Sequence, residues 1–199
     1  MDRLRVYADH LIRWQETQNL VSRNSLPHLW DRHMLDSIQL VRHLPASAAS
    51  ITDIGSGAGF PGLVLAIATG LPTELIESHG RKGAFLREVA ELTDAPAEIV
   101  TARVEDVATA RGLVKGSESA AAIPEKPVDI LTARALAPLE KLCGMADSLG
   151  ARTCLFLKGG RWREELTEAG KRWKMDLETF DSVTSDEGCI LRITGLKRR

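Results

Sequence analysis

Apolar positions at helical spacing mark the first 48 residues of the chain. Within residues 2–18, four of them fall on one stripe: Leu4, Ala8, Leu11 and Ile12. Ser25 and Pro27 then head a second helical stretch, whose apolar positions are Leu29, Met34, Ile38 and Val41. The pattern predicts a helical cap over residues 1–48.

The pattern changes near residue 49, where short β-type runs begin to alternate with helical periods. Strands are expected at 50–54, 73–77, 97–101, 128–132 and 153–157. Helices are expected at 62–69, 81–93, 104–110, 138–148 and 161–173. Such alternation is typical of βαβ units around a parallel sheet. We therefore predict one compact α/β unit over residues 49–199.

Two segments of this unit depart from the alternation. Residues 112–127 lack an apolar period and predict a surface loop between the third and fourth strands. The runs at 177–183 and 189–194 flank a polar link, which predicts an antiparallel hairpin that closes one edge of the sheet.

Composition limits the classes of partner and compartment. With 199 residues, of which 44% are hydrophobic, the chain can bury one full core. Its 26 basic and 27 acidic residues nearly balance, so any contact with RNA must come from a local patch rather than from a global field. The charged start and the absence of a long apolar run predict a cytoplasmic protein with neither a signal peptide nor a membrane span.

Cysteine and histidine usage predicts neither disulfides nor a metal site. Cys143, Cys154 and Cys189 have no paired spacing, and we expect them to be reduced core residues. The five histidines form no zinc-type spacing with cysteines or carboxylates, so no metal is expected.

The segment Asp53–Gly62 carries the most chemical information, and its sequence is Asp-Ile-Gly-Ser-Gly-Ala-Gly-Phe-Pro-Gly. It predicts a strand, a glycine turn and a helix start, where bare main-chain amides let a ligand approach closely. Gly57, Gly59 and Gly62 match the GxGxxG spacing of dinucleotide sites. Glu77 ends the second strand, where a carboxylate accepts both ribose hydroxyls. These residues indicate a nucleoside ligand, and they leave open a nicotinamide-binding reductase or a nucleotide-binding regulatory module.

Other polar residues at the ends of predicted elements are candidates for contact with ligand or substrate. Arg134 ends the fourth strand and Lys158 the fifth, where side chains project toward the ligand cleft of an open sheet. Arg134 suits a phosphate, guanine O6 or a carboxylate, with a surface ion pair as the alternative. Lys158 suits an RNA phosphate, with a solvated helix start as the alternative. His33 and Asp36 lie three residues apart, so they face the same way on a helix, either as a surface contact or as part of a site.

The spacing Asp53-x-Gly55-x-Gly57-x-Gly59 resembles the first motif of class I S-adenosylmethionine-dependent methyltransferases. Beyond this motif, nearly the whole chain resembles the RsmG (GidB) family, whose members methylate N7 of a guanine in the decoding region of 16S ribosomal RNA. Six further blocks carry this resemblance in the same order: Asn19–Ser22, Arg32–Ser37, Glu77–Leu86, Ala102–Glu105, Thr132–Ala135 and Leu157–Gly159.

The resemblance implies a fold, a cofactor and a partner. The expected fold is the Rossmann-like class I methyltransferase fold, an α/β architecture with a seven-stranded, mostly parallel sheet and an N-terminal helical cap. The expected cofactor is S-adenosyl-L-methionine. The expected substrate is the guanine numbered 527 in 16S ribosomal RNA, reached by a monomer either in the RNA or in the small ribosomal subunit.

The resemblance also implies roles for residues at matching positions. The implied cofactor-binding set is Asp53, Gly55, Gly57, Gly59, Phe60, Glu77, Val104, Glu105 and Arg134. Within it, Gly55 and Phe60 are expected at the methionine side, and Val104 and Glu105 at the adenine. The substrate-side candidates at the mouth of the cleft are Asn19, His33, Asp36, Ser37 and Lys158.

In this scheme Arg134 positions the reactants and transfers no proton. Guanine N7 carries a lone pair and no hydrogen, so it can attack a sulfonium methyl group without a general base, and alignment is the main requirement. The chain has no Asn-Pro-Pro-Tyr segment and no Pro-Cys pair, which favours a ring nitrogen as the target. A class I methyltransferase that acts on another RNA base or on a small molecule is the alternative.

Overall fold

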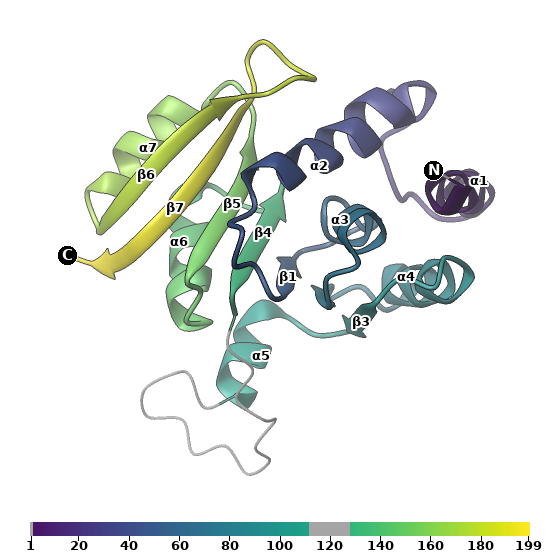
Figure 1. Cartoon of the computed structure of the whole chain (residues 1–199), viewed down its shortest axis with the longest axis horizontal. Coiled ribbons are helices and arrows are strands. Elements are labelled where there is room, and N and C mark those ends of the chain that lie inside the picture. The colour runs from purple at the N-terminus through teal and green to yellow at the C-terminus, as the bar shows by residue number, and fades with distance from the viewer. Residues whose placement is uncertain (1, 112–127) are drawn as a thin grey trace.

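The computed structural model describes residues 2–111 and 128–199, so the loop predicted at 112–127 lies outside the described residues. Seven strands form one sheet in the order β3-β2-β1-β4-β5-β7-β6. Their bounds are β1 Ile51–Ile54, β2 Thr73–Ile76, β3 Ala97–Val100, β4 Ile130–Arg134, β5 Thr153–Lys158, β6 Trp173–Asp181 and β7 Cys189–Arg198. The first five pair in parallel, whereas β7 is antiparallel to β5 and to β6 (Figure 1). The predicted mostly parallel sheet and its edge hairpin are confirmed.

Helices cover both faces of this sheet. The helices of the sheet unit are α3 Gly62–Thr69, α4 Gly80–Leu92, α5 Val104–Ala110, α6 Leu139–Ser148 and α7 Trp162–Gly170. One buried cluster joins the sheet to α5, α6 and α7, and a second joins it to α1 (Asp2–Gln15), α3 and α4. Figure 1 shows α6 and α7 on one side of the sheet and α1, α3 and α4 on the other. Every residue of the strands β1 and β2 is therefore buried, including polar ones such as Asp53 and Glu74, as expected for a parallel sheet that is covered on both faces.

The strand order places a ligand crevice between β1 and β4. The chain leaves β1 in one direction to form β2 and β3, and then returns to form β4 on the other side of β1. Connections that depart in opposite directions open a crevice at the carboxyl ends of the two strands. The glycine turn follows β1 at this point, and Arg134 is the last residue of β4.

The edge hairpin differs from its predicted bounds. The helix expected at 161–173 ends at Gly170, and Trp173 is the first residue of β6. The reason is a period of two along β6, in which buried or half-buried Trp173, Met175 and Leu177 alternate with exposed residues. The partner strand β7 continues to Arg198, which pairs with Trp173, so the hairpin is longer than the sequence runs indicated.

The buried face of the first helix of the cap is rotated about the helix axis relative to the predicted face. Leu4, Ala8 and Leu11 are buried as expected, but Tyr7 completes the stripe and Ile12 is 48% exposed. Both sets fit a helical period, and only the position of the neighbouring helices α3 and α4 selects between them. The Tyr7 ring stacks on Phe60 with centroids 5.4 Å apart, and its hydroxyl donates to the Ala58 carbonyl oxygen.

The second stretch of the cap is helical but irregular. It consists of η1 Leu26–His28, the π-helical η2 Trp30–Leu35, α2 Asp36–Ile38 and the 3₁₀ segment η3 Gln39–His43. The wide turn separates the buried Leu29 and Met34 by five residues, and the tighter turns then bury Ser37 and Leu40. Val41, predicted on the buried stripe, is therefore 37% exposed. The division of the chain at residue 48 stays a prediction.

Two expectations from composition can be compared with the structure. All three cysteines are free and buried, which confirms their assignment to the core. Among the described residues, no helix combines the length and the apolar character needed to cross a membrane.

Close packing of α3 against the sheet generates the first prediction. A Cβ atom on Gly62 would lie 2.5 Å from the Asp53 Cβ and against the Leu75 side chain, so Gly62→Ala should lower the free energy of unfolding by about 1–3 kcal/mol. Gly80→Ala, at the start of α4, is the matched control, because nothing lies within 4 Å of its Cβ position. Urea unfolding of both variants measures the difference. Equal stability of the two would refute this packing constraint.

Candidate functional site

A cavity of about 990 Å³ opens at the carboxyl ends of β1, β4 and β5. It is lined by the glycine turn, the start of α4, the loop after β4, the end of β5 with the start of α7, the turn between β6 and β7, and parts of the cap between residues 20 and 36. These segments are far apart in the sequence, and the sheet topology brings them together at one edge. The cavity is large enough for a nucleoside-sized ligand together with part of a second molecule.

The glycine turn presents bare main chain to this cavity. The amides of Gly55 and Ser56 donate to the Ile76 carbonyl oxygen at 2.8 and 3.2 Å, which fixes the turn against β2. Gly57 has φ of +58°, and a Cβ atom there would meet only the Gly55 oxygen, at 3.8 Å. The backbone at Gly57 is therefore in a conformation that favours glycine, with an open face on which a ligand can lie.

Glu77 supports the turn from the end of β2. Glu77 is 7% exposed; its Oε2 accepts the Gly57 N–H at 2.8 Å and its Oε1 accepts the His79 N–H at 2.8 Å. Each carboxylate oxygen retains acceptor capacity after one such bond. Glu77 does not line the cavity, and its expected contact with ribose hydroxyls remains a prediction.

Asp53 and Gly59 support the turn from inside the fold. Asp53 is fully buried, and its Oδ1 accepts the Thr132 hydroxyl at 2.7 Å. Burial raises the pKa of Asp53 to about 6, and the Thr132 hydrogen bond opposes part of this rise. Gly59 packs beneath the cap, because a Cβ atom there would lie 2.6 Å from the Tyr7 hydroxyl oxygen. Neither residue lines the cavity, so their contact with a cofactor also stays a prediction.

Arg134 is held by the cap. Its Nη1 donates to the Arg32 carbonyl oxygen at 2.9 Å and to Asp36 Oδ2 at 3.1 Å, and its Nη2 donates to His33 Nδ1 at 2.7 Å. The guanidinium carbon lies 5.1 Å from the centre of the Phe60 ring. The side chains of Arg134 and Asp36 are 17% and 18% exposed, so this is a partly desolvated ion pair inside the site and not a surface pair.

His33 links Arg134 to the start of the cap. Because its Nδ1 accepts from Arg134, the ring is neutral with its hydrogen on Nε2, which lies 2.9 Å from the Ser25 hydroxyl oxygen. Burial lowers the pKa of His33 to about 4; the positive charge of Arg134 adds to this effect, and Asp36 opposes it. Ser25 forms no helix cap, and its hydroxyl donates to the Ser22 carbonyl oxygen instead.

Lys158 lies at the edge of the cavity with its charge already paired. Its ammonium contacts Glu165 Oε2 at 2.6 Å and donates to the Ala137 carbonyl oxygen at 3.0 Å. The side chain is 8% exposed, so Lys158 is not a solvated helix start. Its contact with an RNA phosphate stays a prediction.

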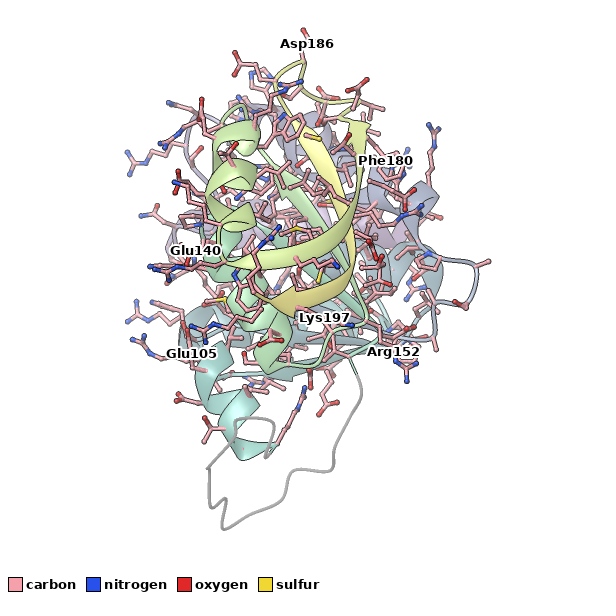
Figure 2. All side chains as sticks on the ribbon, turned by 90° about the vertical axis from the view of Figure 1, so that its left-hand side faces the viewer. Glu105, Glu140, Arg152, Phe180, Asp186 and Lys197 are labelled. Atoms are coloured by element: carbon pink, nitrogen blue, oxygen red, sulfur yellow. The ribbon has the colours of Figure 1, made fainter. Side chains whose placement is uncertain are left out.

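The cavity gathers half of the residues expected from the sequence. Seven of them line it: Gly55, Gly57, Phe60, His33, Asp36, Arg134 and Lys158. Four of the others lie elsewhere: Val104 is buried, Glu105 and Asn19 are exposed, and the Ser37 hydroxyl donates to the His33 carbonyl oxygen. Figure 2 shows Glu105 well separated from Asp186, which lies in the β6–β7 turn.

Sequence reasoning missed several residues that build the site. They are Tyr7, Gln39, Thr132, Glu165 and Thr184. The burial of Tyr7 could have been predicted, because its position fits the apolar stripe of the first helix as well as that of Ile12 does. The others are single polar residues in common patterns, and nothing local distinguishes them. Within residues 2–111 and 128–199, no group of three or more potential metal ligands is found.

Comparisons with known proteins agree with this geometry. The model of the family described as rRNA small subunit methyltransferase G matches residues 1–189. The protein of that name from Paramagnetospirillum magneticum is 42% identical over 100% of this chain and 90% of its own length. That from Parvibaculum lavamentivorans is 46% identical over 98% of this chain and 83% of its own.

Solved structures share the fold at low sequence identity. An O-methyltransferase from Bacillus cereus in complex with SAH superposes with a TM-score of 0.61 and 12% identity, covering 95% of this chain and 90% of its own. The 16S rRNA methylase RmtB superposes with a TM-score of 0.56 and 14% identity, covering 97% and 74%. The predicted class I methyltransferase fold is confirmed.

The arrangement around His33 predicts its titration. His33 should titrate at a pKa of about 4, below its ordinary 6.5, so its contribution to stability is present above pH 6.5 and is lost as the pH falls through 4. Asp53 changes stability with pH in the opposite direction, because burial raises its pKa to about 6. The two contributions overlap in a measurement of global stability, so the pKa of His33 should be measured by site-resolved NMR of its ring. Arg134→Ala should raise the pKa of His33. A wild-type value near 6.5, or a hydrogen on Nδ1, would contradict the arrangement.

Proposed function

The chain belongs to the rRNA small subunit methyltransferase G family, and from this premise we propose that it transfers a methyl group from S-adenosylmethionine to N7 of a guanine in the decoding region of 16S ribosomal RNA. The observation that carries the proposal is the family match over residues 1–189, together with an open glycine turn at the wall of the cavity. The protein is an enzyme, and ribosomal RNA is its partner.

The residues around the glycine turn fit the cofactor. The open face at Gly57 accepts a ligand against the main chain, and the buried Glu77 carboxylate beside it has acceptor capacity left for two ribose hydroxyls. Gly55, Gly57 and Phe60 would hold the methionine side, with Val104 and Glu105 toward the adenine. When bound, S-adenosylmethionine supplies a methyl group activated by a sulfonium, which a ring nitrogen with a free lone pair can accept without losing a proton.

The protein's own task is therefore alignment and the exclusion of water. The N7–methyl bond forms as the sulfur–methyl bond breaks, and the positive charge passes to the purine ring. No residue has to remove a proton, which agrees with a site whose histidine is neutral and already bonded on both ring nitrogens. Orientation of two reactants in one cavity is the main effect that we propose for this site.

Arg134 is the residue suited to orient the substrate. Three of its N–H groups are used by Arg32, His33 and Asp36, and no acceptor for the remaining two is found in the described residues. Those two groups can donate to guanine O6, to a phosphate or to the cofactor carboxylate. We assign Arg134 the role of positioning, with Asn19, His33, Asp36 and Ser37 supporting the wall of the cap.

The RNA contact is local, because the net charge of the chain is close to zero. Lys82, near the start of α4, and Arg161, just before α7, lie at the cavity, and they are the cations we propose for RNA phosphates. The target guanine must leave its stack to enter, a step that costs least in unpaired RNA. We propose that the protein acts in the cytoplasm, as a monomer without a metal.

The target atom can be tested directly with a modified RNA. Purified protein should methylate a 16S decoding-region fragment, with the product mapped to N7 of one guanine. The same fragment with 7-deazaguanosine at that position should accept no methyl group, because carbon replaces the nucleophilic nitrogen. A 7-deazaguanosine at a neighbouring guanine is the control and should leave the rate unchanged. Methylation of the deaza target would refute N7 as the acceptor.

Glu77 provides a test of the cofactor site. Glu77→Ala should weaken binding of S-adenosylhomocysteine by about 1.5–3 kcal/mol, because the ribose hydroxyls lose a charged acceptor and Gly57 loses its support. Glu91→Ala, an exposed residue on α4, is the control and should bind as the wild type does. Isothermal titration calorimetry measures both, with NAD as a ligand that should not bind. An unchanged affinity in Glu77→Ala would remove Glu77 from the ribose site.

A further inference from the structure

The turn between β6 and β7 contacts the cap through polar groups, of which the Gln39 side chain is buried. Gln39, on η3, is 5% exposed; its Oε1 accepts the Val183 N–H at 2.9 Å, and its Nε2 lies 3.3 Å from the Ser182 hydroxyl oxygen. Figure 1 shows this turn at the top of the hairpin, on the side where α2 lies. Ser182 and Thr184 also line the cavity. The turn is therefore both a wall of the site and an anchor for the cap.

Asp36 forms hydrogen bonds with the β6–β7 turn, with the cap and with Arg134. Its Oδ1 accepts the Thr184 hydroxyl at 2.7 Å and the Gln39 amide at 2.9 Å, and its Oδ2 accepts Arg134 Nη1 at 3.1 Å. A carboxylate oxygen has two lone pairs, so Oδ1 is fully used. The carboxylate plane, and with it the direction in which Oδ2 faces Arg134, is fixed by the two donors on Oδ1.

The Thr184 hydroxyl is itself held in the orientation that this bond requires. The Ser182 and Thr184 hydroxyl oxygens lie 3.0 Å apart, and the Thr184 N–H donates to Ser182 Oγ at 3.2 Å. Because Thr184 donates its only hydroxyl hydrogen to Asp36, it accepts the hydrogen of Ser182. The turn thus presents one donor, in one geometry, to the carboxylate.

We propose that Thr184 is a positioning residue for methyl transfer, which acts through Asp36 to set the direction of the Arg134 guanidinium. The inference rests on the proposed function for its kinetic consequence, but the geometry stands without it. Two N–H groups of Arg134 have no acceptor among residues 2–111 and 128–199 and are available to a ligand, and their direction is determined by the bonds to Asp36, His33 and Arg32. Loss of the Thr184 hydroxyl removes one of the two donors on Oδ1 and leaves only Gln39 there. The carboxylate can then rotate, which weakens the bond between Oδ2 and Arg134.

The kinetic test compares three variants of the full chain. Thr184→Val, which keeps the shape and removes the hydroxyl, should lower kcat for methylation of the 16S fragment about tenfold, the effect of one hydrogen bond to a charged group. KM for the RNA should change little, because Lys82 and Arg161 are untouched. Thr184→Ser should restore the rate. Thr179→Val, the same substitution at an exposed position on β6, is the matched control and should act as the wild type does.

A double-mutant cycle tests whether the effect passes through Arg134. In an Arg134→Ala background, Thr184→Val should cause no further loss of rate, because the group it positions is gone. An equal loss in both backgrounds would overturn the inference. If Thr184→Val does not fold, Thr184→Ala takes its place in the cycle.

A readout without substrate separates this inference from the proposed function. Burial lowers the pKa of His33, and the Arg134 charge adds to this effect. The pKa should therefore rise above its wild-type value in Thr184→Val and not in Thr184→Ser, because the Arg134 charge is held less firmly at Nδ1. If wild-type protein fails to methylate the RNA while this rise is seen, the proposed function fails and the positioning contact stands. A fully active Thr184→Val with an unmoved His33 pKa would refute the positioning role.

Discussion

The contact between the Glu77 carboxylate and the Gly57 N–H is the constraint on which the site depends. This hydrogen bond, with 2.8 Å between the Gly57 nitrogen and Glu77 Oε2, joins the end of β2 to the middle of the glycine turn. The same turn is held from below by Asp53, whose carboxylate is bonded to Thr132 on β4, and from above by Tyr7, whose hydroxyl bonds to Ala58. A segment of four glycines would otherwise lose much conformational entropy on ordering. Bonds from three separate elements keep it in one conformation, ready for a ligand.

The cap shares its packing with the cofactor side of the cavity. Phe60 shows this most clearly, since its ring stacks on Tyr7 from the first helix and has both His33, at 4.9 Å between ring centres, and the Arg134 guanidinium beside it. The irregular second stretch of the cap delivers three side chains to the same place: Ser25, His33 and Asp36. The proposed positions of the cofactor, against the turn, and of RNA, at the mouth of the cavity, are thereby parts of one packed assembly, in which Arg134 is the common element.

Most of the fold and the centre of the site could be predicted from the sequence, because both depend on local patterns. The βαβ alternation, the glycine turn and the carboxylate after β2 are each encoded within a few residues. The phase of a helix stripe is not local: Tyr7 and Ile12 fit it equally well until α3 and α4 are in place. The start of β6 at Trp173 depends on pairing with Arg198, which lies 25 positions further along the chain. The bond from Thr184 to Asp36 joins residues 148 positions apart, so no sequence window contains it.

The central claim is that the glycine turn is a preformed cradle for the cofactor, and a crystal structure of the protein with bound S-adenosylhomocysteine tests it most directly. The account predicts that residues 53–62 keep their present conformation, that the ligand lies against Gly55 and Gly57, and that Glu77 retains its bond to Gly57 while it accepts the ribose hydroxyls. A ligand bound elsewhere in the cavity, or a turn that has to rearrange and release Glu77 before the ligand can bind, would contradict it.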